Sequence, residues 1–282
     1  MQQIRVAAVQ MSSGKDYEVN VERAAALVRR AAGEGAAFVA LPENFAAMTS
    51  DSALVERVEP IDGPLFAWGC DLARSLGIDL LLGSIPEESE RPNKRRNTSV
   101  LIDREGRLVA AYRKIHLFDI DLDELRLRES EAVDPGREAV WADLPWGRLG
   151  LTVCYDLRFP ELYRQLAAAR TEVLTVPSAF TAKTGPDHWH LLLCARAVEN
   201  QAFVVAPAQV GQHSPRRASY GHALIVDPWG EVLADAGGEG EGLAIADLDP
   251  ERLTRTRRLL PALDHMRLVV SHPEAGDSSR NG

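Results

Sequence analysis

The sequence predicts a single-domain α/β protein, because short β-rich runs alternate with helical patterns along most of its 282 residues. Several of the β-rich runs are continuously apolar, which is typical of strands covered on both faces. No internal repeat and no linker rich in proline, glycine or serine divides the chain. A chain of this length can bury a full hydrophobic core as one domain.

Strands are expected wherever a short run of apolar residues is bounded by turn-forming residues. These runs are residues 4–9, 38–41, 80–83, 98–102, 149–153, 173–176, 203–206, 223–226 and 243–246. The runs that begin at 203, 223 and 243 follow one another without a long helix between them. This arrangement excludes a repeating βαβ barrel and favours layered helices and sheets.

Four helices are expected from apolar positions at helical spacing. Residues 21–32 show this spacing, and Gly33 ends the pattern. A second helix, 64–76, begins with Pro64, whose fixed φ suits a first helical turn, and ends before Gly77. The remaining two also open on a proline, and they are 160–169 and 186–198.

The domain is expected to span residues 1–270, and the polar, turn-rich residues 271–282 to form a flexible tail. The chain carries 32 basic and 41 acidic side chains, a formal net charge of −9. This balance argues against nucleic acid or an anionic membrane as a partner.

The sequence also predicts a cytoplasmic protein. The chain enters a strand pattern at Ile4 without the charged segment and apolar core of a signal peptide. No apolar run reaches the ~18 residues of a membrane-spanning helix. The three cysteines, Cys70, Cys154 and Cys194, make no disulfide framework, so reduced thiols are expected.

Cys154 occupies the most informative position in the chain. It ends the strand-like run 149–153, and Pro160 then offers the first turn of a helix. A thiol on such a corner can project clear of the sheet and lie near backbone N–H groups that stabilise a thiolate or an oxyanion. The alternative is a buried cysteine that acts only as a small hydrophobic residue.

Two other reactive side chains also follow strand-like runs. Glu43 comes just after the apolar run 37–41, and Lys114 follows a short β-rich run. A carboxylate can activate a thiol, and Lys114 with the N–H of Tyr155 can stabilise an oxyanion by roughly 3–4 kcal/mol per good donor. The alternatives are a solvated Glu43 and a surface Lys114, and spacing alone does not show that the groups meet.

Three segments resemble the signatures of the nitrilase, or carbon–nitrogen hydrolase, superfamily in its Glu, Lys, Cys order. They are Leu-Pro-Glu-Asn-Phe at 41–45, Tyr-Arg-Lys-Ile-His-Leu-Phe at 112–118 and Val-Cys-Tyr-Asp-Leu-Arg-Phe-Pro-Glu at 153–161. The resemblance implies Glu43 as general base, Lys114 as oxyanion stabiliser and Cys154 as nucleophile. Glu129, in a Glu-Ser pair ahead of Pro-Gly at 135–136, matches the superfamily's second glutamate. The alternative for Glu129 is a surface acid in the charged stretch 126–131.

The same resemblance carries an expected fold and reaction. The superfamily fold is a four-layer α-β-β-α sandwich, usually paired as a homodimer through helices of each subunit. The implied reaction is two-step acyl transfer, in which a thioester forms on Cys154 and a small linear amide becomes a carboxylic acid and ammonia. It requires no metal and no organic cofactor.

Within the superfamily the chain resembles the Nit branch, whose amidases act on 2-oxo acids. The segments Gly-Gln-His at 211–213 and Ser-Tyr-Gly-His at 219–222 resemble amidases of deaminated glutathione more than omega-amidases. The resemblance places Phe180 and Thr184 in the substrate pocket with Arg158, whose planar guanidinium suits a carboxylate. The alternative for Arg158 is a structural ion pair with Asp156 or Glu161.

Three functions other than hydrolysis of deaminated glutathione stay open. They are an omega-amidase acting on α-ketoglutaramate, an enzyme for a different amide, and a non-catalytic binding protein that keeps the fold. A metal site is not expected, because the histidines at 188, 190, 213 and 222 lie on a helix and in separate loops without matched cysteine or aspartate partners.

Overall fold

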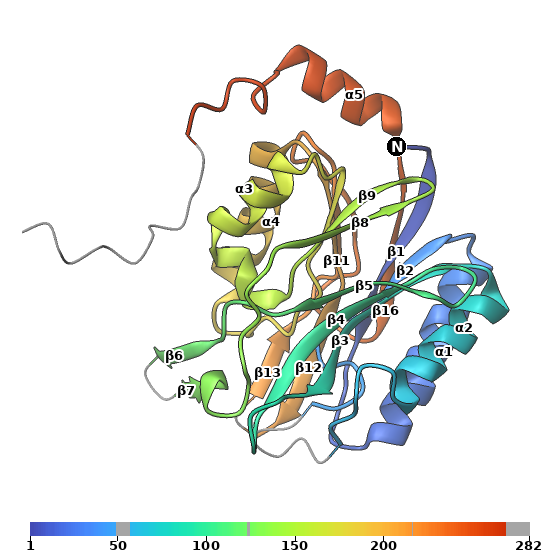
Figure 1. Cartoon of the computed structure of the whole chain (residues 1–282), viewed down its shortest axis with the longest axis vertical. Helices are drawn as coiled ribbons and strands as arrows, with labels where there is room; N and C mark the ends of the chain where they lie inside the picture. The colour runs from blue at the N-terminus through green and yellow to red at the C-terminus, as the bar shows by residue number, and fades with distance from the viewer. Residues whose placement is uncertain (49–56, 123–124, 216, 269–282) are drawn as a thin grey trace, which may run out of the picture.

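Two β-sheets packed face to face, each covered on its outer face by helices, form the body of the molecule (Figure 1). The computed structural model describes residues 1–48, 57–122, 125–215 and 217–268. The α1 helix (Tyr17–Gly33) and the α2 helix (Pro64–Leu76) cover one sheet, and α3 (Pro160–Ala168) and α4 (Gly185–Asn200) cover the other. The expected four-layer α-β-β-α sandwich is confirmed.

The larger sheet is mixed and has the order β13-β12-β1-β2-β3-β4-β5, with β16 also paired to β1. Its strands are β1 (Ile4–Met11), β2 (Phe38–Ala40), β3 (Asp79–Glu88), β4 (Arg95–Ile102), β5 (Leu108–Arg113), β12 (Ala208–Ser214), β13 (Arg217–Tyr220) and β16 (Gly242–Leu248). The smaller sheet has the order β15-β14-β11-β10-β9-β8. Its strands are β8 (Val140–Leu144), β9 (Gly147–Leu151), β10 (Val173–Thr175), β11 (Phe203–Ala206), β14 (Leu224–Val226) and β15 (Val232–Asp235).

Strand β1 is continuously apolar because both of its faces are buried. Val6 and Ala8 point into the core between the two sheets, whereas Ala7 and Val9 point into the core beneath α1 and α2. All four side chains are fully buried. Because successive side chains alternate between faces, a strand covered on both sides must be apolar at every position.

The expected strands and helices are all present; α2 and β11 (Phe203–Ala206) have the expected bounds, and the bounds of the others are shifted. The structure also contains elements that no local sequence pattern predicted. They are the polar strands β12 and β13, the short strands β8 and β15, the pair β6 (Asp119–Leu122) and β7 (Leu125–Arg128), and the helix α5 (Pro250–Leu259). Helix α5 buries only Leu253 and Thr256, so its apolar stripe is too narrow to be recognised. The tail expected at 271–282 lies outside the described residues. No helix in the described ranges is long and apolar enough to cross a membrane.

Candidate active site

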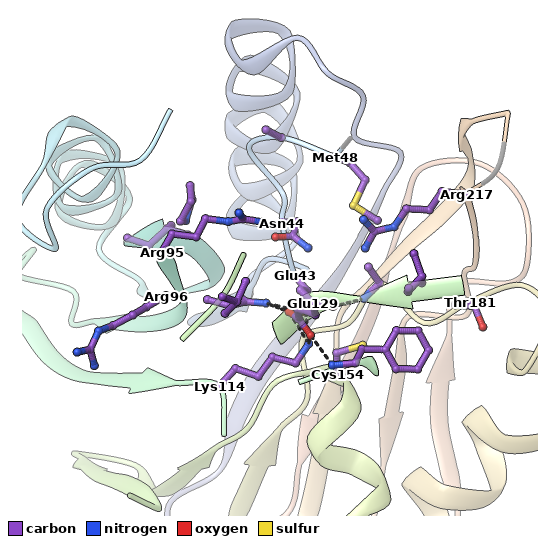
Figure 2. Close-up of a pocket in the computed structure, with 18 residues that line it drawn as sticks. Glu43, Asn44, Met48, Arg95, Arg96, Lys114, Glu129, Cys154, Thr181 and Arg217 are labelled. Atoms are coloured by element: carbon purple, nitrogen blue, oxygen red, sulfur yellow. Dashed lines mark hydrogen bonds and ion pairs between the residues drawn. The ribbon is translucent and has the colours of Figure 1, made fainter. Parts of the chain in front are cut away.

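A cavity of about 750 Å³, including its mouth, lies among the loops that follow the carboxyl ends of β2, β5, β9 and β10. The four residues expected to react, Glu43, Lys114, Glu129 and Cys154, all line it. Figure 2 shows these side chains directed toward one another at its base. Segments far apart in the sequence therefore meet at one edge of the sandwich, where the sheets present their loop ends.

Glu43 is held in the buried loop after β2. One of its oxygens, Oε1, accepts hydrogen bonds from Asn97 Nδ2 at 2.9 Å and Lys114 Nζ at 3.0 Å, and Oε2 accepts one from the Ala179 N–H at 2.9 Å. The loop packs directly on Gly83 of β3, where a Cβ would lie 1.8 Å from the Leu41 carbonyl oxygen. Only glycine permits this approach, which sets the position of Glu43.

Lys114 follows β5 and is 2% exposed. Its ammonium donates to Glu43 and also to Glu129, at 3.1 Å to Oε1 and 2.8 Å to Oε2. Glu129 opens a short 3₁₀ helix, η2 (Glu129–Glu131), and its Oε2 accepts the Phe118 N–H at 2.7 Å. The ammonium is thus shared by two carboxylates, and Asn97 Nδ2 reaches Glu129 as well, at 3.2 Å.

Cys154 begins the 3₁₀ helix η3 (Cys154–Arg158) with a left-handed φ of 48°. A non-glycine residue adopts this conformation only where its surroundings impose it. The Cys154 N–H donates to the Pro177 carbonyl at 3.0 Å, and the thiol lines the same cavity as the Glu43 carboxylate. The adjacent Tyr155 N–H belongs to the first turn of η3, where N–H groups have no partner within the helix.

The charges of the cluster define its resting protonation state. Burial favours a neutral Glu43, but the Lys114 charge and the hydrogen bonds from Cys154 and Lys114 outweigh it and hold the Glu43 pKa below its usual range. Burial also opposes the ammonium, yet Glu129 and Glu43 together raise the pKa of Lys114. Burial and the nearby Glu43 charge raise the pKa of the Cys154 thiol. The resting site therefore holds a neutral thiol beside a carboxylate base and an ammonium group.

Residues 5–258 match the carbon-nitrogen hydrolase family. The chain belongs to this family. A human protein named deaminated glutathione amidase is 44% identical over 268 residues, which cover 93% of this chain and 82% of the human one. A protein of the same name from Synechocystis sp. (strain PCC 6803 / GT-S) is 43% identical over 263 residues, covering 92% of this chain and 96% of its own.

Among solved structures, Saccharomyces cerevisiae Nit3, a member of branch 10 of the nitrilase superfamily, is 36% identical with a TM-score of 0.84. The match covers 92% of this chain and 95% of Nit3. The predicted superfamily and its Nit branch are confirmed, and the chain is an enzyme of the amidase class.

The residues expected to bind substrate line a smaller cavity beside Cys154 in this carbon-nitrogen hydrolase. Arg158, Phe180 and Thr184 form it together with Tyr155. The Arg158 guanidinium lies 3.2 Å from His188 Nδ1 and 3.4 Å from Thr184 Oγ1, and it stacks over the Phe180 ring at 5.1 Å. The ion pairs of Arg158 with Asp156 or Glu161 that were considered as alternatives are absent from the described part of the chain.

Sequence reasoning missed two polar residues that organise the carbon-nitrogen hydrolase site. Asn97, on β4, joins Glu43 to Glu129. Asp156 is fully buried and accepts the Val153 N–H at 2.8 Å, the Tyr112 hydroxyl at 2.7 Å and the His116 N–H at 3.1 Å. The available signal was an aspartate two residues after the cysteine, in a segment otherwise apolar enough to be buried.

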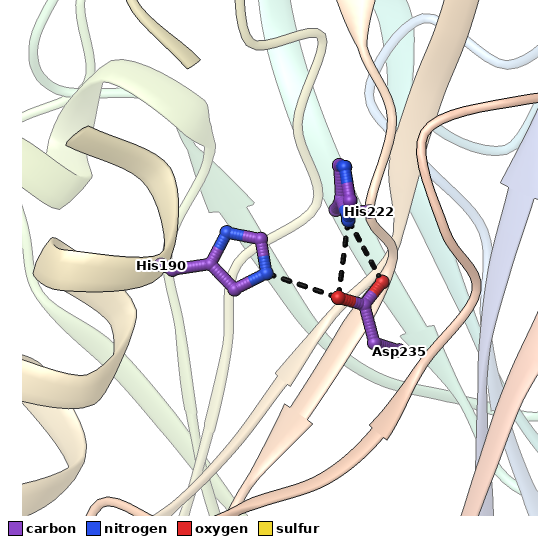
Figure 3. A group of neighbouring side chains, drawn as sticks. All are labelled: His190, His222 and Asp235. Carbon is purple, nitrogen blue, oxygen red and sulfur yellow. Dashed lines mark hydrogen bonds and ion pairs between the residues drawn. The ribbon is translucent and has the colours of Figure 1, made fainter. Parts of the chain in front are cut away.

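The histidines correct one premise of the sequence analysis. His190 and His222 do have an aspartate partner, because Asp235 lies 3.0 Å from a ring nitrogen of each (Figure 3). Within the described ranges this is the group whose donor atoms lie close enough to hold a metal ion. The Asp235 carboxylate already bonds both rings and the Gly237 N–H, at 2.8 Å, so the contacts of the cluster are accounted for without an ion.

Proposed function

We propose that this amidase uses Cys154 as nucleophile and Glu43 as general base, with Lys114 and the Tyr155 N–H stabilising the oxyanion. The Cys154 sulfur attacks the amide carbon while Glu43 accepts the thiol proton. A C–S bond forms and negative charge moves onto the carbonyl oxygen. Collapse of this adduct breaks the C–N bond, and the leaving nitrogen takes the proton from Glu43.

The second step regenerates the enzyme. Glu43 removes a proton from water as the water oxygen attacks the thioester carbon. The C–S bond breaks, the carboxylic acid leaves, and the sulfur recovers the proton from Glu43. Glu129 does not take part in these transfers in our scheme. It holds the Lys114 ammonium against the attraction of Glu43, so that the donor faces the developing oxyanion.

One observation carries this proposal. A buried carboxylate that bonds an ammonium group lies beside a neutral thiol, and all three line a cavity that adjoins the one holding Arg158. A general base must lie near the proton that it removes, and Glu43 lines the same cavity as Cys154 and its charge acts on the Cys154 thiol. A non-catalytic binding protein would have no use for this arrangement, which burial makes costly to keep.

For the substrate we propose deaminated glutathione, on the support of relatives named for this activity, which are matched over 96% of the Synechocystis protein and 82% of the human one. Its 2-oxo acid carboxylate would bind Arg158, because a guanidinium can donate two parallel hydrogen bonds to a carboxylate. This orientation presents the γ-amide to Cys154. Deaminated glutathione is a tripeptide derivative without a primary amide, so its leaving group is an amine. The expectation of ammonia therefore applies only to primary amides such as α-ketoglutaramate.

The test measures hydrolysis of deaminated glutathione and α-ketoglutaramate side by side, following the released dipeptide and the released ammonia. Cys154→Ala serves as the blank. A preference of about tenfold or more in kcat/KM for the tripeptide derivative supports the proposal, since it amounts to about 1.4 kcal/mol of transition-state binding. The reverse preference would make the protein an omega-amidase. Activity on neither substrate would reject both assignments.

We further propose that the enzyme is a cytoplasmic homodimer. Cys70, Cys154 and Cys194 are all free, which suits a reducing compartment. Leu191 and Val198 lie two turns apart on α4 and are 67% and 45% exposed, and Trp229 is 55% exposed. A Cβ on Gly230 would lie 2.7 Å from Val198 Cγ2, so the Trp229 loop adjoins this face of α4. An apolar face of this kind suits a second copy of the chain.

A further inference from the structure

Three arginines line the cavity that holds Glu43, Lys114, Glu129 and Cys154, and the proposed reaction uses none of them. Among the described residues that line this cavity the carboxylates are Glu43 and Glu129, and both bond Lys114. The other charged lining residues are Arg95, Arg96 and Arg217. Among the described lining residues the basic side chains outnumber the acidic ones, whereas the chain as a whole carries a net charge of −9.

Arg95 and Arg217 approach the cavity from two different strands of the large sheet. Arg95 is the first residue of β4 and Arg217 the first of β13. Figure 2 shows both side chains extending toward Asn44 from opposite sides, above the cluster of reacting groups, whereas Arg96 turns away. Two guanidinium groups therefore converge on the end of the cavity that lies away from Lys114.

The backbone at Arg95 is fixed, which makes its side chain a dependable binding element. Its N–H donates to the Ala132 carbonyl at 3.0 Å, and its own carbonyl accepts the Asp134 N–H at 2.8 Å. The strand residue is thus bonded to the segment that follows Glu129. A guanidinium has five N–H donors, so it can bind a carboxylate while it keeps a contact within the protein.

Cys154 lies between the smaller cavity and the end of the larger cavity that holds Arg95 and Arg217. The two cavities share Cys154, Phe118, Ala179 and Thr181 as lining residues. The smaller cavity, of about 200 Å³, holds Arg158, and the larger one holds Arg95 and Arg217. An amide carbon at the Cys154 sulfur would direct one substituent toward each group of arginines.

We propose that Arg95 and Arg217 form a second carboxylate subsite, which binds the leaving-group half of the substrate. The preferred substrate is then a dianion with one carboxylate on each side of the scissile amide. This inference rests on the proposed function and deepens it, because the two carboxylates of deaminated glutathione flank its γ-amide in this way. The leaving group of α-ketoglutaramate is ammonia, which has no carboxylate to fill the subsite.

The test compares deaminated glutathione with its C-terminal glycinamide, which lacks only the leaving-group carboxylate. In the wild-type enzyme the amide should have a kcat/KM roughly tenfold or more lower, the loss expected for one charged hydrogen-bonding contact. Arg95→Met and Arg217→Met should each lower kcat/KM for the acid through KM. Both variants should retain wild-type kinetics on the glycinamide and on α-ketoglutaramate. Arg29→Met, which replaces an exposed arginine of α1 that lines neither cavity, is the matched control and should change kcat/KM for neither substrate.

Binding to Cys154→Ala keeps the test independent of turnover. In this background deaminated glutathione should bind more tightly than its glycinamide, and adding Arg217→Met should abolish the difference. Equal binding of acid and amide would overturn the subsite even if the enzyme hydrolyses both. Tighter binding of the acid without any wild-type turnover would retain the subsite and reject the proposed substrate. Equal losses on acid and amide in the arginine variants would show a structural role instead.

Discussion

The Tyr112 hydroxyl donates a 2.7 Å hydrogen bond to the Asp156 carboxylate, which joins the segment carrying Lys114 to the segment carrying Cys154. Each partner lies two residues from a side chain that we propose to act in catalysis, and both partners are fully buried. The bond crosses from β5 of the large sheet to η3, which follows the small sheet. The relative position of ammonium and thiol is therefore set partly by this one contact.

Tyr112→Phe should lower kcat through mispositioning of Cys154, with little change in KM. Removing one donor to a buried carboxylate costs about 1–3 kcal/mol, so unfolding free energy should fall by a similar amount. Tyr163→Phe is the matched control, because Tyr163 is also buried and its hydroxyl lies 3.0 Å from Thr152 Oγ1. Steady-state kinetics and urea unfolding of both variants check this. Equal kcat losses in the two variants would argue against a positioning role for Tyr112.

Lys114→Met should abolish turnover and destabilise the fold by about 3–5 kcal/mol, because it leaves two carboxylates buried without their cation. The pH dependence of stability should also change sign. In the wild type the lowered pKa of Glu43 contributes stability above the ordinary value of 4.5, and this is lost as pH falls through the folded-state value.

Without Lys114 the folded state binds protons more tightly than the unfolded state, so stability is gained on acidification and lost as pH rises. Urea unfolding near pH 5 and near pH 8 measures the difference. Lys94→Met is a control outside the cluster. A Lys114→Met variant with wild-type stability at both pH values would contradict the account of the buried charges.

The activity should follow the titration of Glu43, because the reaction needs a carboxylate base and a protonated thiol. Since the pKa of Glu43 is lowered and that of Cys154 is raised, kcat/KM should be flat around neutral pH and fall only below about pH 4.5. Alkylation of Cys154 by iodoacetamide should slow markedly in Glu43→Gln. An unchanged alkylation rate in that variant would mean that the thiolate forms without Glu43.

Gly83→Ala should displace the Glu43 loop, because the new Cβ would lie 1.8 Å from the Leu41 carbonyl oxygen. We expect a loss of about 1–3 kcal/mol in unfolding free energy and a fall in kcat. Gly33→Ala, which meets nothing within 4 Å at the end of α1, should leave both unchanged or raise stability slightly. Thermal unfolding measures the stability of both variants, and steady-state kinetics measures their kcat. A fully active and stable Gly83→Ala variant would contradict the role of this contact.

Trp229→Arg and Leu191→Arg should convert the dimer into a monomer in light scattering after size exclusion. A buried arginine without a partner cannot be accommodated in an apolar interface. Val19→Arg replaces an exposed apolar residue of α1, on the opposite helical layer, and should stay dimeric. A wild-type monomer at micromolar concentration would reject the proposed dimer.

Much of the fold could be predicted from local patterns. The continuously apolar strands and the proline and glycine boundaries of α2 specify their own structure, because both depend on residues close in sequence. The polar strands β12 and β13 could not be recognised in this way. They are ordered by pairing with β1 and with each other, at sequence separations that a local pattern does not report.

The sequence alone indicated the family, because the three ordered segments around Glu43, Lys114 and Cys154 resemble its signatures. It also predicted these side chains as the reacting groups. Only the tertiary structure decided how these groups share protons and charge. Sheet register and loop closure bring four further residues to the site, namely Asn97, Asp156, Arg95 and Arg217. Their contacts join segments that are far apart in the sequence, so no local pattern reports them.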